Sequence, residues 1–160
     1  MTNPSPDTST QTKPDALIVQ RMLALFYDLW PVVALWVLLS ALFNAGYFLA
    51  GHGERDILKT GSALGMLLWL CCWLIAGVYA LISWSRGGQT LGMRPWRLRV
   101  IGMNGTPPTR KRLIQRYVVG TLSLLFGGLG FWWAWLDRER LTWHDRASGT
   151  RMVRIPNAKS

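Results

Sequence analysis

The sequence predicts an all-α membrane protein with two clear transmembrane helices and a third membrane segment. Half of its 160 residues are apolar, and they form three long blocks separated by polar stretches. About 20 apolar residues in a helix match a bilayer hydrocarbon core of about 30 Å, and the first two blocks reach this length. Several of the ten tryptophans stand at block ends, where aromatic belts meet the membrane surface.

The membrane segments are expected at about residues 22–43, 63–84 and 117–136. The second contains no charged residue, which makes it the clearest transmembrane helix of the three. The third is apolar but contains Gly127-Gly128. It therefore either crosses the membrane or enters it and turns back at this pair. Non-helical backbone at such depth is tolerated only where protein or water covers it.

The segments belong to a single membrane domain over residues 17–155. Residues 1–15 are rich in Ser, Thr, Pro and Gln, which predicts a disordered N-terminal tail, and residues 156–160 form a C-terminal tail. Residues 97–100 alternate polar and apolar side chains, so we expect a short β-strand in the basic linker. Residues 150–155 are a second candidate strand. A re-entrant third segment would let these two strands pair on one side of the membrane.

The distribution of basic residues indicates the orientation. The 85–112 linker carries seven, without an acidic residue: Arg86, Arg94, Arg97, Arg99, Arg110, Lys111 and Arg112. The 51–60 loop has only two, so the positive-inside rule places the linker and the N-terminus in the cytoplasm. Six basic residues follow the third segment, which favours a cytoplasmic tail and a re-entrant path. The net charge of +10 indicates anionic lipid headgroups as partners, at about 1 kcal/mol per nearby cation, rather than nucleic acid.

A charged pair on the first helix is the main candidate site. Arg21 and Asp28 are seven residues apart, so they share one helix face with about 10.5 Å between them along the axis. Arg21 can extend to the membrane surface, whereas Asp28 lies about two turns deep, where a carboxylate is costly and needs a partner. We expect that partner to be Arg116 or Arg112. Two interpretations stay open: a cation or proton site, and a buried ion pair that fixes helix packing.

The sequence offers little support for an enzyme, a metal site or a cofactor. His144-Asp145 resembles a catalytic or metal-binding pair, but a second histidine or a known catalytic motif does not accompany it. Such a dipeptide more often forms local salt bridges or caps a turn. Cys71 and Cys72 are adjacent within an apolar helix, which excludes a disulfide between them.

Three motifs in order resemble the RDD family of small bacterial membrane proteins, named for one arginine and two aspartates. The first is the opening helix, Arg21 to Asp28. The second is the linker, which contains Gly88, Thr90 and Gly92. The third closes the chain, with His144, Asp145, Gly149 and Thr150.

The resemblance implies a multi-pass protein of the bacterial plasma (inner) membrane. Arg21 and Asp145 match the family signature best, Asp28 fits its first-helix carboxylate, and Asp137 is a further candidate. A transport role proposed for the family suggests a small transporter, or transporter component, for ions or small solutes. Self-association or a partner membrane protein is expected, because three segments enclose little space. The alternative is a non-transporting scaffold or accessory protein that binds anionic lipid or a partner protein.

Overall fold

A computed structural model of the chain describes residues 17–51 and 62–156. Their order is α1 (Ile18–Leu49), α2 (Ala63–Gly87), β1 (Leu98–Gly102), α3 (Arg110–Leu125), α4 (Leu129–Leu136), α5 (Trp143–Ser148) and β2 (Thr150–Arg154). The all-α membrane class is confirmed. The predicted disordered tail, most of the 51–60 loop and nearly all of the C-terminal tail lie outside the described residues.

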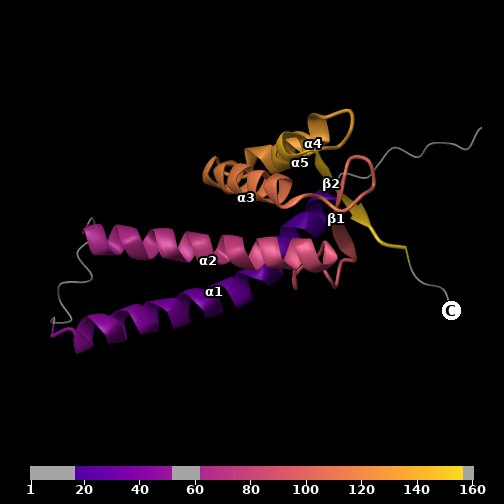
Figure 1. The fold of residues 1–160 in the computed structure, drawn as a ribbon. Coiled ribbons are helices and arrows are strands. Elements are labelled where there is room, and N and C mark those ends of the chain that lie inside the picture. Colours follow the sequence, from indigo (N-terminus) through magenta and orange to yellow (C-terminus); the bar gives the residue numbers. More distant parts are fainter. Residues whose placement is uncertain (1–16, 52–61, 157–160) are drawn as a thin grey trace, which may run out of the picture.

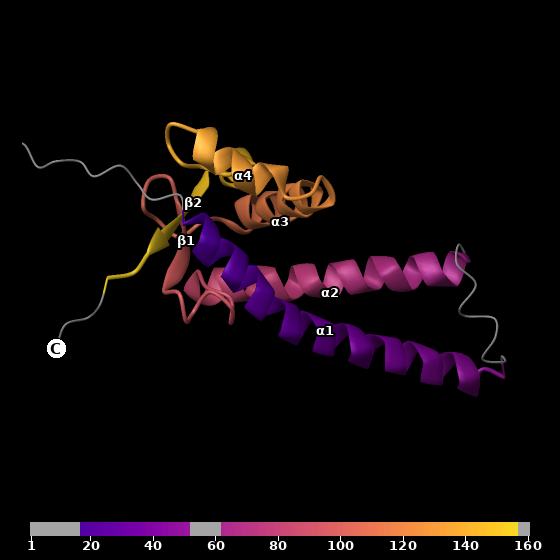
Figure 2. The same cartoon turned by 180° about the vertical axis from the view of Figure 1, so that it is seen from behind.

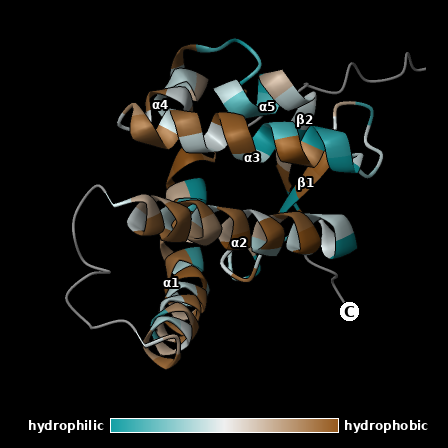
Figure 3. Ribbon diagram, turned by 60° about the vertical axis from the view of Figure 1, so that its left-hand side comes forward, coloured by the Kyte–Doolittle hydropathy of each residue, from teal (hydrophilic) through white to brown (hydrophobic). Residues whose placement is uncertain are grey.

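The two long helices α1 and α2 are both long and apolar enough to cross a membrane. Their 32 and 25 residues correspond to about 48 Å and 37 Å, and α1 is longer than predicted at both ends. The helices lie close where α1 begins and α2 ends, and they separate toward their other ends (Figure 1). Hydrophobic residues make up most of both helices (Figure 3), as lipid contact requires.

The third membrane segment is two helices, α3 and α4, that meet at 98°. The break falls at the predicted glycine pair. Gly127 and Gly128 have φ values of 67° and 76°, in the left-handed region that glycine adopts without a steric penalty. After α4, the short helix α5 packs along α3. The chain thus returns to the end of the molecule where α3 began (Figure 2).

The two predicted strands are present and pair with each other. β1 and β2 are antiparallel, with Arg99 opposite Val153. Leu98 and Val100 on β1 are fully buried and alternate with the exposed Arg99, as period-two alternation requires. They join Ala24 of α1 in the core. The pairing therefore holds the basic linker, the C-terminal strand and the start of α1 together at one end of the molecule.

Helix α2 is the central element against which the other two membrane segments pack. A side chain at Gly77 would place its Cβ 2.8 Å from the Tyr117 ring, so the glycine lets α3 approach closely. The Tyr117 hydroxyl donates to the Trp73 carbonyl at 2.7 Å, and Trp73 Nε1 donates to Thr121 Oγ1 at 3.3 Å. α1 packs on α2 as well, but it scarcely contacts α3. α2 therefore joins the other two membrane segments.

We expect the linker and the turn before α5 to face the same side of the membrane. With Cys71 and Cys72 both replaced by alanine, the exposed positions Thr106 and Glu139 should, as single cysteines, react with a membrane-impermeant maleimide from one face. A cysteine at Ala50, at the far end of α1, should react from the opposite face. Labelling of Glu139→Cys from the Ala50 side would contradict the returning path of α4 and α5.

Candidate functional site

A buried carboxylate, Asp145, joins α1, α3 and α5. Arg21 Nη1 donates to Asp145 Oδ2 at 2.5 Å, and Arg116 Nη1 donates to Asp145 Oδ1. We call Arg21, Asp145 and Arg116 the charge triad. The triad is positioned by the start of α5, where Thr142 and Asp145 form a reciprocal capping box. Such a box satisfies backbone N–H groups that the first helical turn leaves unpaired.

The charge triad is almost completely removed from solvent. The exposed fractions are 3% for Arg21, 2% for Arg116 and 0% for Asp145. Burial alone would raise the pKa of Asp145, but the charges of Arg116 and Arg21 outweigh it and hold that pKa well below its ordinary value. Arg116 also donates to Thr150 Oγ1 at 2.8 Å and lies 5.5 Å from the centroid of the Trp84 ring. The triad therefore consists of two guanidiniums that share one ionised carboxylate.

His144 lies beside the triad as a buried, uncharged imidazole. Its ring packs against Phe131 with 4.7 Å between centroids. Burial, followed by the charge of Arg116, lowers the pKa of His144 to about 3, although Asp145 acts in the opposite direction. In the part of the chain that the structure describes, no group of three or more His, Cys, Asp or Glu side chains could hold a metal ion.

Asp28 is held by a separate set of donors, which we call the Asp28 clasp. The Tyr79 hydroxyl donates to its Oδ1 at 2.7 Å, and the Gly92 N–H donates to the same atom at 2.8 Å. The Thr90 hydroxyl donates to Oδ2. A side chain at Gly92 would overlap the backbone of α1 at Ala24, so only glycine lets the linker lie this close.

The structure corrects the partner expected for Asp28. The sequence suggested Arg116 or Arg112, but Arg116 is engaged by Asp145 and Asp28 accepts hydrogen bonds from neutral donors. The reason is that the linker folds back over α1. Gly88 ends α2 in the left-handed region, and the chain after it places Thr90 and Gly92 on the carboxylate.

The remaining motif residues shape the turns around α5. Asp137 ends α4, accepts from the Leu141 N–H at 2.9 Å and pairs with Arg146 at 2.7 Å. Gly149 ends α5 in the left-handed region, and Thr150 begins β2 while accepting from Arg116. These residues thus position the triad and the sheet.

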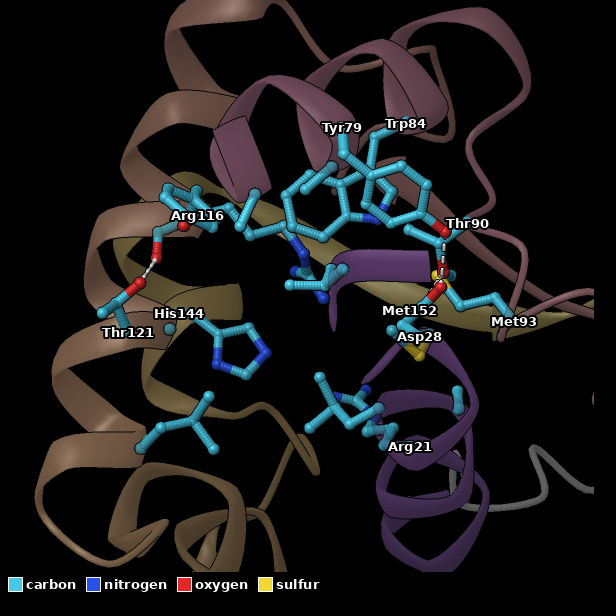
Figure 4. Close-up of a pocket in the computed structure, with 18 of the residues that line it drawn as sticks. Arg21, Asp28, Tyr79, Trp84, Thr90, Met93, Arg116, Thr121, His144 and Met152 are labelled. Atoms are coloured by element: carbon cyan, nitrogen blue, oxygen red, sulfur yellow. Dashed lines mark hydrogen bonds between the residues drawn. The ribbon is translucent and has the colours of Figure 1, made fainter. Parts of the chain in front are cut away.

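A cavity of about 180 Å³ lies between the charge triad and the Asp28 clasp. The side chains of Arg21, Arg116 and His144 approach one another on one side, while Asp28 and Thr90 meet on the other (Figure 4). Apolar residues of α1, α2, α3 and α4 form most of the remaining wall: Leu25, Val32, Ala76, Ala80, Leu124 and Phe131. The cavity thus combines charged groups with an apolar interior.

The comparisons with known proteins identify the family. A family model described as the RDD family matches residues 16–149. The chain belongs to the RDD family. Among curated proteins and among solved structures, none matches it. In this RDD chain, the two residues assigned most securely by motif, Arg21 and Asp145, form an ion pair although 124 positions separate them.

Sequence reasoning missed several residues of the site. Tyr79 was not singled out, because a tyrosine in a charge-free helix is normally interpreted as a packing residue. Trp84 is one of the tryptophans at block ends, a position typical of the membrane surface, and its contact with Arg116 has no signal in the sequence. One available signal was Thr142-x-x-Asp145, which has the spacing of a capping box and would have placed Asp145 at a helix start.

Asp145→Asn should strongly destabilise the protein, because it leaves two buried guanidiniums without their shared counter-charge. We expect a loss of about 3–5 kcal/mol in the free energy of unfolding, measured by titration with sodium dodecyl sulfate in mixed micelles. Asp137→Asn is the matched control. Asp137 is 6% exposed, but its partner Arg146 is 55% exposed and stays hydrated, and an amide oxygen at this position can still accept from the Leu141 N–H. The loss should therefore be smaller, about 1–2 kcal/mol. Equal losses would contradict the role given to the triad.

His144 should make stability depend on pH. Its pKa is about 3 in the fold against 6.5 ordinarily, so the unfolded chain takes up the proton first as pH falls. The contribution of the uncharged imidazole to the free energy of unfolding is therefore full above pH 6.5 and declines progressively toward pH 3. Arg21, Arg116 and Asp145 are the charged groups that act on it. His144→Phe should flatten the change in thermal midpoint between pH 7 and pH 4. An unchanged slope would mean that another group titrates there.

Proposed function

We propose that this RDD protein is a small transporter, or the membrane component of one, for ions or small solutes. The observation that supports this is the cavity between the charge triad and the Asp28 clasp. Ionisable side chains within membrane segments are costly and usually serve a pathway or a binding site. Helices broken by glycine, such as the α3–α4 pair, also occur at the binding sites of transporters.

The Asp28 clasp provides a way to couple charge to movement. The carboxylate accepts three hydrogen bonds, two of them from the linker residues Thr90 and Gly92. Uptake of a proton or a cation by Asp28 would weaken these bonds, because they are strongest to an ionised acceptor. The linker would then be free to move away from α1. In this proposal Asp28 controls access to the cavity, and the triad remains fixed.

A non-transporting scaffold is the second candidate, and the exposed surfaces favour it. Basic side chains of the linker and the sheet stand exposed together at one end of the molecule, among them Arg97, Arg99, Arg151 and Arg154. They suit anionic lipid headgroups, at about 1 kcal/mol each. The most apolar stretch of α1 has no residue buried inside the protein. A second copy or a partner membrane protein would find a large apolar surface there.

Both candidates share one proposed setting. We place the protein in the bacterial plasma membrane, with the linker, α5 and the paired strands on the cytoplasmic side. A non-enzymatic role agrees with the site, since both oxygens of Asp145 are engaged by Arg21 and Arg116. The pKa of this carboxylate is held too low for it to act as a general base.

Reconstitution into liposomes tests the transport proposal. We expect imposed pH and cation gradients to produce flux that depends on the protein, followed with an internal pH-sensitive dye. Asp28→Asn should reduce this flux at least tenfold, because the side chain can no longer change its charge. Glu139→Gln, at an exposed position, is the control and should retain the flux.

Two outcomes would count against this proposal. Flux that Asp28→Asn leaves unchanged would exclude Asp28 as the coupling site. If flux is absent altogether and the protein purifies with one partner, the scaffold function would replace transport.

A further inference from the structure

The lining of the cavity includes hydrogen-bond donors that lack an acceptor. Three buried nitrogen atoms of its lining residues have no hydrogen-bond partner among the described residues: Arg21 Nε, Trp84 Nε1 and His144 Nδ1. The first two always carry a hydrogen and can only donate. Buried donors without a partner are rare in folded proteins, and each one calls for an explanation. All three atoms are closed off from solvent, but all three residues line one cavity. An acceptor in the cavity therefore reaches these atoms after a small movement of the side chains around them.

The carboxylates near the cavity are already engaged. Asp145 accepts from Arg21, Arg116 and the Thr142 N–H. Asp28 accepts from the clasp on the opposite side of the cavity. The triad contains two positive groups and one negative group, which leaves one positive charge on its side. An acceptor that enters from outside would therefore be favoured if it carried one negative charge.

The rest of the cavity is suited to an apolar body. The apolar part of its wall includes Leu25 and Val32 of α1, Leu124 of α3 and Phe131 of α4. The volume of about 180 Å³ is close to the roughly 150 Å³ of an apolar cavity that binds benzene. A body of about six carbon atoms therefore fits inside.

We propose that the cavity binds an amphipathic organic monoanion, with its carboxylate near Arg21, Trp84 and His144 and its apolar body against α1 and α3. This rests on the proposed function and names its substrate class. Such an acid could be water-borne and short, or it could be a fatty acid from the bilayer whose chain leaves between the two helices. Both sources present the same carboxylate to the same donors.

Binding of a fluorinated short acid tests the proposal. The full chain is placed in phosphatidylcholine nanodiscs, and 6-fluorohexanoate is followed by the width of its fluorine NMR signal, with empty nanodiscs subtracted. We expect saturable broadening that unlabelled hexanoate reverses. 6-Fluorohexanol and 6-fluorohexylammonium have the same chain without the negative charge, so both should bind at least tenfold more weakly. Equal binding of the acid and the alcohol would overturn the proposal.

Substitutions at Gly120 and Trp84 test whether the ligand binds in this cavity. Gly120 lies in the wall, and the nearest atom to a Cβ at this position is His144 Cγ at 4.0 Å. Gly120→Leu should therefore fill the cavity and abolish binding, while Gly120→Ala should retain both fold and binding. Trp84→Phe keeps an aromatic ring beside Arg116 but removes one donor. This substitution should weaken binding of the acid about tenfold and leave binding of the alcohol unchanged. A purely structural role of Trp84 would not produce this difference.

The remaining outcomes show whether the acid comes from the bilayer or from water, and they also test the ligand class itself. Displacement of 6-fluorohexanoate by oleate in the bilayer would support a lipid-derived acid, and displacement by hexanoate alone would support a water-borne one. The absence of saturable binding, or binding unchanged in Gly120→Leu, would overturn the ligand class. Flux that depends on Asp28 would survive that result, so the two proposals can fail separately.

Discussion

The carboxylate of Asp145 is the group on which the arrangement of the molecule depends. It lies where the start of α1, the first turns of α3 and the start of α5 meet, and it binds a guanidinium from each of the first two. Three charges in so little solvent are tolerated only when each is paired. The need to keep them paired therefore constrains the path of the chain: the segment after α4 has to return to the place where α1 begins.

The return of the chain also accounts for the small sheet and the cavity. Once α5 is held against α3, β2 follows directly and pairs with β1, which fixes the linker. The linker in turn places Thr90 and Gly92 on Asp28. The cavity lies between these two polar clusters, and residues of α1, α2 and α3 line it. Transport and ligand binding are proposals built on this cavity.

Local features of the fold followed from the sequence, and long-range contacts did not. A charge-free apolar run predicts a helix such as α2 by itself, and a glycine pair predicts the break between α3 and α4. The alternation around Arg99 predicts β1 in the same way. The predicted partner of Asp28 was wrong. Spacing along one helix shows which residues share a face, but it does not show which segment folds back over that face. Arg116, one of the two expected partners of Asp28, is buried, but it pairs with Asp145 on α5 rather than with Asp28 on α1.

A double-mutant cycle between Arg21 and Asp145 tests the central claim most directly. The four proteins are the parent, Arg21→Met, Asp145→Asn and the double variant, each unfolded in mixed micelles. If the two side chains share a buried ion pair across 124 positions, loss of Asp145 should matter much less once Arg21 is gone. We predict a coupling energy above about 1 kcal/mol. Effects that add to within about 0.5 kcal/mol would show that the two residues act independently and would contradict the account.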